Sequence, residues 1–327
     1  MIATPSNSLQ SPPPTLDGGL GLDAPICSVR GAARHIIPIS GKDSLATAII
    51  QTAREPNLNY EYIYNDTKME LPETYDWMDK VERVMGIEII RAGKSLKTII
   101  EEQKILPSPM TRYCTKYAKI FPMRDYIGKD EATLYIGIRA DEDRPGAQET
   151  KNLHVKYPLK EMGVNLAVVY RLVEGKDLMP PAFFWQLVYD MVVAQLGDQA
   201  WIIKEIPKWI FDRTFAWRSR PNCYMCFYQR IYEWCGLLLH HPELFADAED
   251  IEARSGYSEN TKSHAFLWLG KDKPLSYIRD NAERIIQARV DKICKILRKR
   301  LQMELFNDGL CDELEAAQTS CGLYCGK

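Results

Sequence analysis

Residues 35–50 read HIIPISGKDSLATAII, an apolar strand that passes through a Ser-Gly turn into a helix. The apolar residues of 35–39 predict a buried strand, and the pattern that follows predicts a helix over residues 45–53. Such a turn gathers backbone N–H groups at the positive end of the helix, which makes an anion site, usually for phosphate. Gly41 also allows a ligand to approach the backbone closely. The turn therefore predicts a phosphate site.

The side chains of this turn suit the same purpose. Lys42 adds a positive charge, and the hydroxyl groups of Ser40 and Ser44 are hydrogen-bond donors. Asp43 either holds a metal or caps the helix. An ordinary strand-to-helix turn with a good N-cap explains SGKDS alone equally well, so the functional interpretation depends on the rest of the chain.

Short apolar runs alternate with amphipathic segments between residues 34 and 150. This alternation predicts a Rossmann-like, doubly wound α/β fold, because each parallel strand needs a helical crossover. The predicted strands are 35–39, 60–65, 87–92 and 133–140, with 164–173 as one more strand, and the predicted helices are 45–53, 73–85 and 96–103. From residue 179 onward the patterns predict helices. We divide the chain into a flexible N-terminal arm (1–33), a nucleotide-binding α/β domain (34–175) and a mainly helical, Cys-containing region (176–327).

Composition narrows the classes of function. The chain has 327 residues, of which 46% are hydrophobic, and a formal net charge of −2, so it lacks the global positive charge of a stand-alone nucleic-acid binder. The basic stretch 292–302 carries its apolar residues on one helical face, which favours a solvated helix surface. No apolar run reaches the length of a spanning helix, and the first residues lack the pattern of a secretory signal. We expect a cytoplasmic protein that does not enter the membrane.

Four motifs in order resemble one known family. SGKDS (40–44) resembles the PP-loop of the adenine-nucleotide alpha hydrolases, whose usual form, SGGKDS, has one more glycine. NDTKMELPET (65–74), TRYCTKYAKIFP (111–122) and GIRADEDRPG (137–146) resemble segments of the phosphoadenosine-phosphosulfate reductase branch of that family. The Cys-containing segment 217–245 is similar to reductase-like proteins of bacterial antiphage defence loci, and this branch resembles the ATP-pyrophosphatase component of DNA phosphorothioation systems.

The resemblance implies a nucleotide across the carboxyl ends of the strands. It implies catalytic roles for Lys42, Asp43, Ser44 and Cys114, and binding of ATP with Mg²⁺. The residues that it implies in nucleotide binding are Ser40, Gly41, Lys42, Asp43, Ser44, Asp66, Arg112, Lys119, Arg139 and Arg144. Glu70 or Glu73 faces the same crevice, although Glu73 also suits a plain helix start.

Nine cysteines are many for a reducing compartment. The pairs Cys223 with Cys226 and Cys321 with Cys325 suit a four-thiolate site for zinc or a [4Fe-4S] cluster, and buried apolar thiols are the alternative. Cys114 lies beside several cations, which favours a nucleophilic thiolate or persulfide carrier; a cluster ligand or a core cysteine remains equally open. The remaining cysteines are expected to pack as small apolar groups: Cys27, Cys235, Cys294 and Cys311.

These features suggest three alternative functions. The first is an ATP pyrophosphatase that adenylates an acceptor and supports sulfur transfer in DNA phosphorothioation, with a cysteine desulfurase as sulfur donor and DNA contacted through partner proteins. The second is a thioredoxin-dependent sulfonucleotide reductase, for which Cys321 in the tail SCGLY (320–324) is the support. The third is a regulatory module that binds a nucleotide without catalysis, consistent with the shortened loop.

Overall fold

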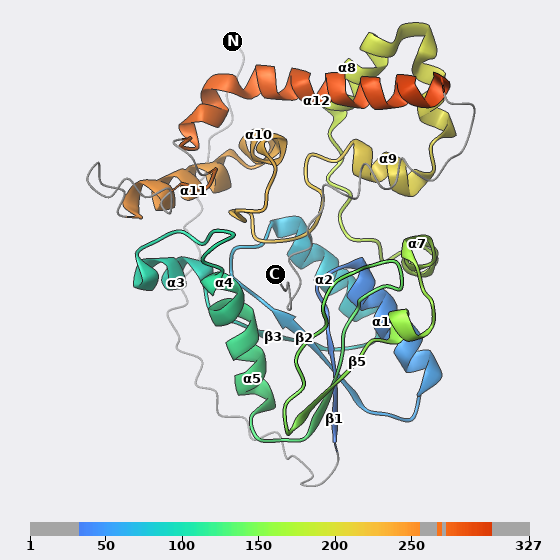
Figure 1. Ribbon diagram of the computed structural model, residues 1–327, viewed down its shortest axis with the longest axis vertical. Helices are drawn as coiled ribbons and strands as arrows, with labels where there is room; N and C mark the ends of the chain where they lie inside the picture. Colours follow the sequence, from blue (N-terminus) through green and yellow to red (C-terminus); the bar gives the residue numbers. More distant parts are fainter. Residues whose placement is uncertain (1–32, 256–266, 270–272, 303–327) are drawn as a thin grey trace, which may run out of the picture. The chain divides into compact units, whose positions relative to one another are not determined.

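The computed structural model describes residues 33–255, 267–269 and 273–302 (Figure 1). Within them, five parallel strands form one sheet in the order β3-β2-β1-β4-β5, and a helical region follows. The strands are β1 (Arg34–Pro38), β2 (Tyr60–Asn65), β3 (Ile89–Ala92), β4 (Ala132–Tyr135) and β5 (Leu153–Lys156). The predicted Rossmann-like, doubly wound α/β fold is thereby confirmed.

The sheet is wound in two directions from β1. The chain first runs outward through β2 and β3, and then returns to place β4 on the other side of β1. Ile36 of β1 pairs with Glu61 on one side and with Leu134 on the other. The carboxyl ends of β1 and β4 therefore flank the point at which the order reverses, which is where open α/β sheets bind ligands.

Alternate side chains of β1 pack into two separate hydrophobic cores, one on each face of the sheet. Ile37 packs with Trp77 and Val169 on the face covered by α1, α2 and α7. Ile36 points to the opposite face and packs with Met123 and Ile127 of α5. Both isoleucines are fully buried, as expected for a parallel sheet covered on both faces.

The helices of the α/β part are α1 (Lys42–Arg54), α2 (Pro72–Met85), α3 (Leu96–Gln103), α4 (Tyr113–Thr115), the π-helical turn η1 (Lys116–Ile120), α5 (Phe121–Ile127), α6 (Pro158–Glu161) and α7 (Leu166–Glu174). The C-terminal region contains α8 (Gln186–Leu196), the 3-10 segment η2 (Gly197–Glu205), α9 (Lys208–Thr214), α10 (Ile231–His240), α11 (Pro242–Arg254) and α12 (Ser276–Gln302).

The structure corrects the prediction of a strand at 164–173. This segment forms α7, because the Asn165 side chain caps the helix by accepting a hydrogen bond from the Val168 N–H at 3.1 Å. Leu166, Val169 and Val173 then fall on one buried helical face. The predicted strand at 133–140 is shorter than expected, because β4 ends at Tyr135.

The C-terminal helices share one apolar core. Trp185, Trp234 and Phe245 are buried in it, and α12 packs against α8 and α10 (Figure 1). Ile293 and Leu297 are buried while Lys292 and Lys295 are exposed, which confirms that the basic stretch is one face of a surface helix.

The structure does not test the predicted N-terminal arm or the predicted domain boundary. Residues 1–32, nearly all of the predicted arm, lie outside the described residues, and the boundary at 175 stays a prediction. The described helices include no segment with both the length and the apolar character that a membrane span requires.

Candidate functional site

The Ser-Gly turn joins β1 to α1 and is held by Ser44. The Ser44 hydroxyl oxygen accepts hydrogen bonds from the N–H groups of Ser40 at 2.8 Å and Gly41 at 3.1 Å, and its O–H donates to the Gly41 carbonyl at 2.9 Å. Gly41 is the N-cap of α1. The N–H groups in the first turn of a helix have no acceptor within the helix, because no helical carbonyl lies four residues before them. This end of α1 therefore attracts an anion.

Asp43 lies between two cations at the start of α1. Its carboxylate contacts Lys42 Nζ at 3.1 Å through one oxygen and Arg139 at 3.1 Å through the other. Burial alone would raise the pKa of Asp43, but Lys42 and Arg139 outweigh it and lower the pKa below the usual value. Asp43 is therefore ionised at neutral pH, and with 25% of its side chain exposed it remains accessible.

The segment after β4 fits against the turn. A Cβ atom on Gly137 would lie 2.8 Å from the backbone atoms of Asp43 and Ser44, so only glycine allows this approach. Two residues later, Arg139 turns its buried guanidinium toward Asp43, and it also contacts Asp141 at 2.9 Å and Glu142 at 3.1 Å. The neighbouring strands β1 and β4 thus bring the first and fourth motifs together.

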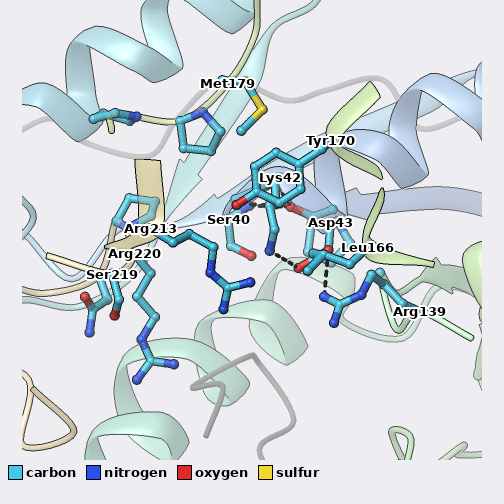
Figure 2. Close-up of a pocket in the computed structure, with 18 of the residues that line it drawn as sticks. Ser40, Lys42, Asp43, Arg139, Leu166, Tyr170, Met179, Arg213, Ser219 and Arg220 are labelled. Atoms are coloured by element: carbon cyan, nitrogen blue, oxygen red, sulfur yellow. Dashed lines mark hydrogen bonds and ion pairs between the residues drawn. The ribbon is translucent and has the colours of Figure 1, made fainter. Parts of the chain in front are cut away.

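A cavity of about 440 Å³ opens in front of the turn (Figure 2). Pockets of this size hold small ligands. Eight cationic and five acidic side chains line it, so its lining carries an excess of positive charge. The cations are Lys42, Lys119, Arg139, Arg144, Lys208, Arg213, Arg218 and Arg220.

The C-terminal region forms the wall opposite the turn. Residues 183–185 and 215–217 pair through an antiparallel bridge, in which the Trp185 N–H donates to the Phe215 carbonyl at 2.7 Å. This pairing fixes the end of α9, which carries Arg213. Figure 2 shows Arg213 extending from this side toward Lys42 and Asp43, with Arg220 beside Arg213.

Arg218 braces the loop that carries Arg220. It is 1% exposed and donates hydrogen bonds to the carbonyls of Arg220, Asn222 and Cys223. The buried Glu233 carboxylate accepts from the Ser219 N–H at 2.7 Å on the same loop. A buried cation that satisfies several carbonyl groups fixes the backbone, so Arg220 is presented from a rigid segment.

Two polar side chains, one at the end of β2 and one in the segment between β2 and α2, line the cavity and have hydrogen-bonding atoms without a partner among the described residues. Asn65 is 7% exposed, lines the cavity, and neither atom of its amide has a partner among the described residues. Glu70 is equally buried, and one of its carboxylate oxygens also lacks a partner. Because buried polar groups are nearly always hydrogen-bonded in native proteins, these atoms indicate a place for a ligand.

Tyr170 of α7 covers the lysine of the turn. Lys42 Nζ lies 5.8 Å from the centre of its ring, and burial raises the pKa of Tyr170 to about 12, so the hydroxyl stays protonated. The helix that replaces the predicted strand therefore contributes a wall of the cavity.

The structure brings most of the predicted binding residues together. The cavity lining includes Ser40, Gly41, Lys42, Asp43, Ser44, Lys119, Arg139 and Arg144. Lys119 comes from η1, a π-helical turn of the kind that is frequent at functional sites. Their roles in binding a nucleotide stay predictions.

Asp66, Arg112 and Cys114 lie outside the lining of this cavity. The Asp66 carboxylate accepts hydrogen bonds from the Lys68 N–H at 2.8 Å and the Tyr75 hydroxyl at 2.9 Å. It therefore stabilises the segment that follows β2. Glu73 contacts His241 at 2.8 Å and is likewise absent from the lining, whereas Glu70 belongs to it.

Both cysteines of the C-x-x-C pair in the C-terminal region are buried. Cys223 Sγ lies 3.1 Å from the Thr67 hydroxyl and 3.8 Å from Glu70, and burial and Glu70 raise the pKa of its thiol. The described residues contain no group of three or more His, Cys, Asp or Glu side chains arranged to hold a metal. Cys321 and Cys325 lie outside the described residues, so the four-thiolate site stays a prediction.

Several residues of the cavity lining are not predicted from the sequence, among them Arg213, Arg220 and Asn65. Arg213 and Arg220 carry no local signal, because they reach the turn only through tertiary packing. Asn65 does carry a signal, because it is the polar residue at the carboxyl end of a predicted strand, directly before the predicted binding residue Asp66.

Comparisons with known proteins agree with the four motifs. Residues 34–165 match the phosphoadenosine phosphosulfate reductase domain. The chain is 24% identical over 79% of its length to the uncharacterized protein MJ0973 of Methanocaldococcus jannaschii, and 26% identical over 64% to the uncharacterized protein MJ0066 of the same organism. These matches span 58% and 39% of the two relatives. No solved structure matches.

Proposed function

We propose that this chain is an ATP pyrophosphatase that adenylates an acceptor, since residues 34–165 match the phosphoadenosine phosphosulfate reductase domain and the four motifs resemble those of the PP-loop superfamily. One observation carries the proposal: the turn that caps α1 opens into a cavity with an excess of cations. A triphosphate matches both the N-terminus of a helix and the surrounding lysine and arginine side chains.

In the proposed reaction, a nucleophile on the acceptor attacks the α-phosphorus of ATP. The bond from that phosphorus to the bridging oxygen breaks, pyrophosphate leaves, and the acceptor carries AMP. Negative charge grows on the leaving group, and cations fixed in advance around it lower the barrier. Lys42 and the N–H groups of α1 would contact the leaving phosphates, and Arg139 would keep Asp43 ionised and oriented.

The donor set fits Mg²⁺ held jointly with phosphates. Mg²⁺ usually binds through one or two carboxylates together with substrate phosphates. Asp43 is an accessible, ionised carboxylate at the turn, and Glu70 has a carboxylate oxygen without a partner. When bound there, Mg²⁺ would neutralise charge on the departing pyrophosphate.

The later steps depend on the family resemblance. In them, DNA is the acceptor, and the terminal sulfur of a persulfide supplied by a cysteine desulfurase attacks the adenylated DNA phosphate and displaces AMP. A second thiol then reduces the resulting S–S bond, which leaves the sulfur on the phosphate and a disulfide on the donor. The competing reductase activity is supported by Cys321, which lies outside the described residues.

The test is an anaerobic turnover assay with ATP, Mg²⁺, DNA, cysteine and a desulfurase. We expect pyrophosphate release from the wild type, and a loss of about a hundredfold or more in Asp43→Asn and Ser44→Ala, because a fixed charge and the support of the turn are removed. Asp177→Asn is the control, since Asp177 is 92% exposed and is not part of the cavity lining. Unchanged turnover in both loop variants, or sulfite release from phosphoadenosine phosphosulfate with thioredoxin in place of pyrophosphate release, would contradict the proposal.

A further inference from the structure

A second hollow lies between α10 and α12, formed by other residues than those of the nucleotide cavity. It is a groove of about 700 Å³, and among the described residues its lining contains four cations, two tyrosines and no carboxylate. The lining residues are Arg230, Ile231, Tyr232, Tyr277, Arg284, Ile285, Ala288, Arg289 and Lys292. With a net charge of −2 for the whole chain, this concentration of positive charge is local.

Between residues 280 and 295, the exposed side of α12 is divided by charge. Arg284, Ala288, Lys292 and Lys295 follow one another at intervals of three or four residues, so they share one face of the helix. The neighbouring exposed face carries Asp280, Glu283, Gln287 and Asp291. The Asp291 carboxylate accepts hydrogen bonds from Gln195 at 3.0 Å and Gln287 at 2.9 Å, which directs it away from the groove.

Arg289 forms the inner end of the groove. It is 6% exposed, donates a hydrogen bond to the Thr214 carbonyl at 2.7 Å, and lies 4.4 Å from the centre of the Tyr232 ring. Its Nε atom has no partner among the described residues. A buried guanidinium donor that lines an open groove and remains unused indicates an anionic partner.

We propose that this groove binds a strand of single-stranded nucleic acid. Phosphates would contact the cations along α12, and bases would stack against Tyr232 and Tyr277, since aromatic rings interleaved with cations are the usual surface for unpaired strands. An acidic protein segment would use the cations but gain little from the tyrosines. The inference does not depend on the proposed function, because no groove residue lines the nucleotide cavity.

Fluorescence anisotropy with a labelled single-stranded DNA of about 20 nucleotides tests the proposal. If four cations each neutralise one phosphate, the logarithm of the binding constant should fall with the logarithm of salt concentration with a slope of about −3. Arg284→Glu with Lys292→Glu should weaken binding at least tenfold and lower the slope to about −1.5. Tyr277→Leu should weaken binding about fivefold and leave the slope unchanged.

The matched control is Lys129→Glu with Lys176→Glu, which makes the same change of charge at two exposed lysines outside the groove. This control should bind almost as the wild type does. Thermal unfolding of each variant verifies the fold, and Lys292→Gln alone replaces the double variant if that one does not fold. The proposal is overturned if no binding occurs at low salt, if the two double variants weaken binding equally, or if poly-glutamate competes as well as unlabelled single strand.

Discussion

Gly137 has no side chain, and the backbone of Asp43 lies where one would be. A Cβ atom there would be 2.8 Å from three backbone atoms of Asp43 and Ser44, and backbone cannot move aside as the end of a flexible side chain can. We therefore expect Gly137→Ala to displace the turn and weaken ATP binding by about tenfold or more, measured by calorimetry, while the circular dichroism spectrum is retained.

Gly128→Ala is the control for that variant. Gly128 has a φ of 62° at the end of α5, so alanine there costs about 1 kcal/mol of folding stability through backbone strain, without contact to the turn. If Gly128→Ala lowered ATP affinity as much as Gly137→Ala, the effect would be general destabilisation.

Single residues differ in how far the sequence predicts them. Ser40 to Ser44 lie at a strand-to-helix turn, whose chemistry is local, so sequence analysis placed them at the cavity. Asn65 and Asp66 are adjacent polar residues at the end of one strand, and alternation sends them in opposite directions. Only the packed structure shows that Asn65 lines the cavity, whereas the Asp66 carboxylate accepts a hydrogen bond from Tyr75.

Arg34 ties three elements together at the amino end of β1. Its guanidinium donates to Glu61 of β2 at 2.7 Å and to the carbonyl of Tyr126 in α5 at 3.0 Å. Burial alone would raise the pKa of Glu61, but hydrogen bonds from Arg34 and Tyr126 outweigh it and lower the pKa below 4.5. This pair therefore stabilises the folded chain at neutral pH.

We expect Glu61→Gln to lower the free energy of unfolding by about 1–2 kcal/mol near pH 7. A carboxyl group whose pKa is lower in the folded state contributes stability above its unfolded pKa, and that contribution is lost as the pH falls through the folded pKa. The difference from the wild type should thus shrink as the pH falls below 4.5. Urea unfolding at several pH values measures it.

Asp130→Asn serves as the comparison, because Asp130 also contacts Arg34 but is 53% exposed. Its effect should be about 0.5 kcal/mol or less. A Glu61→Gln difference that stayed constant with pH would show that packing, rather than ionisation, accounts for the loss.

The elements show where sequence patterns succeed. The predicted strand 60–65 and helix 96–103 match β2 and α3, since each has a clear period and polar boundaries. Residues 164–173 are mostly apolar, and in such a short run helix and strand are hard to distinguish from sequence. The cap at Asn165 favours the helix. β5 has only four residues, LHVK, and two of them are exposed. Its sequence therefore lacks the apolar pattern that predicts a strand.

At the scale of the whole molecule, the cavity has walls from both the sheet and the helical region. The start of α1 contributes Lys42, the loop after β4 contributes Arg139, and the segment after α9 contributes Arg220. Sequence analysis predicted the first wall, because its residues lie in motifs. The C-terminal wall is not predicted from the sequence. Its residues lie far in sequence from the motifs, and they reach the cavity only through the packing of the C-terminal helices.

A nucleotide that contacts both walls should protect both from hydrogen exchange. We expect saturating ATP with Mg²⁺ to slow amide exchange in peptides that cover 40–44 and also in peptides that cover 213–222, because binding to the folded state reduces local opening wherever the ligand makes contact. Arg213→Ala with Arg220→Ala should retain protection at 40–44 and lose it at 213–222, whereas Asp43→Asn should weaken both. Protection confined to 40–44 in the wild type would mean that the C-terminal wall does not contact the nucleotide.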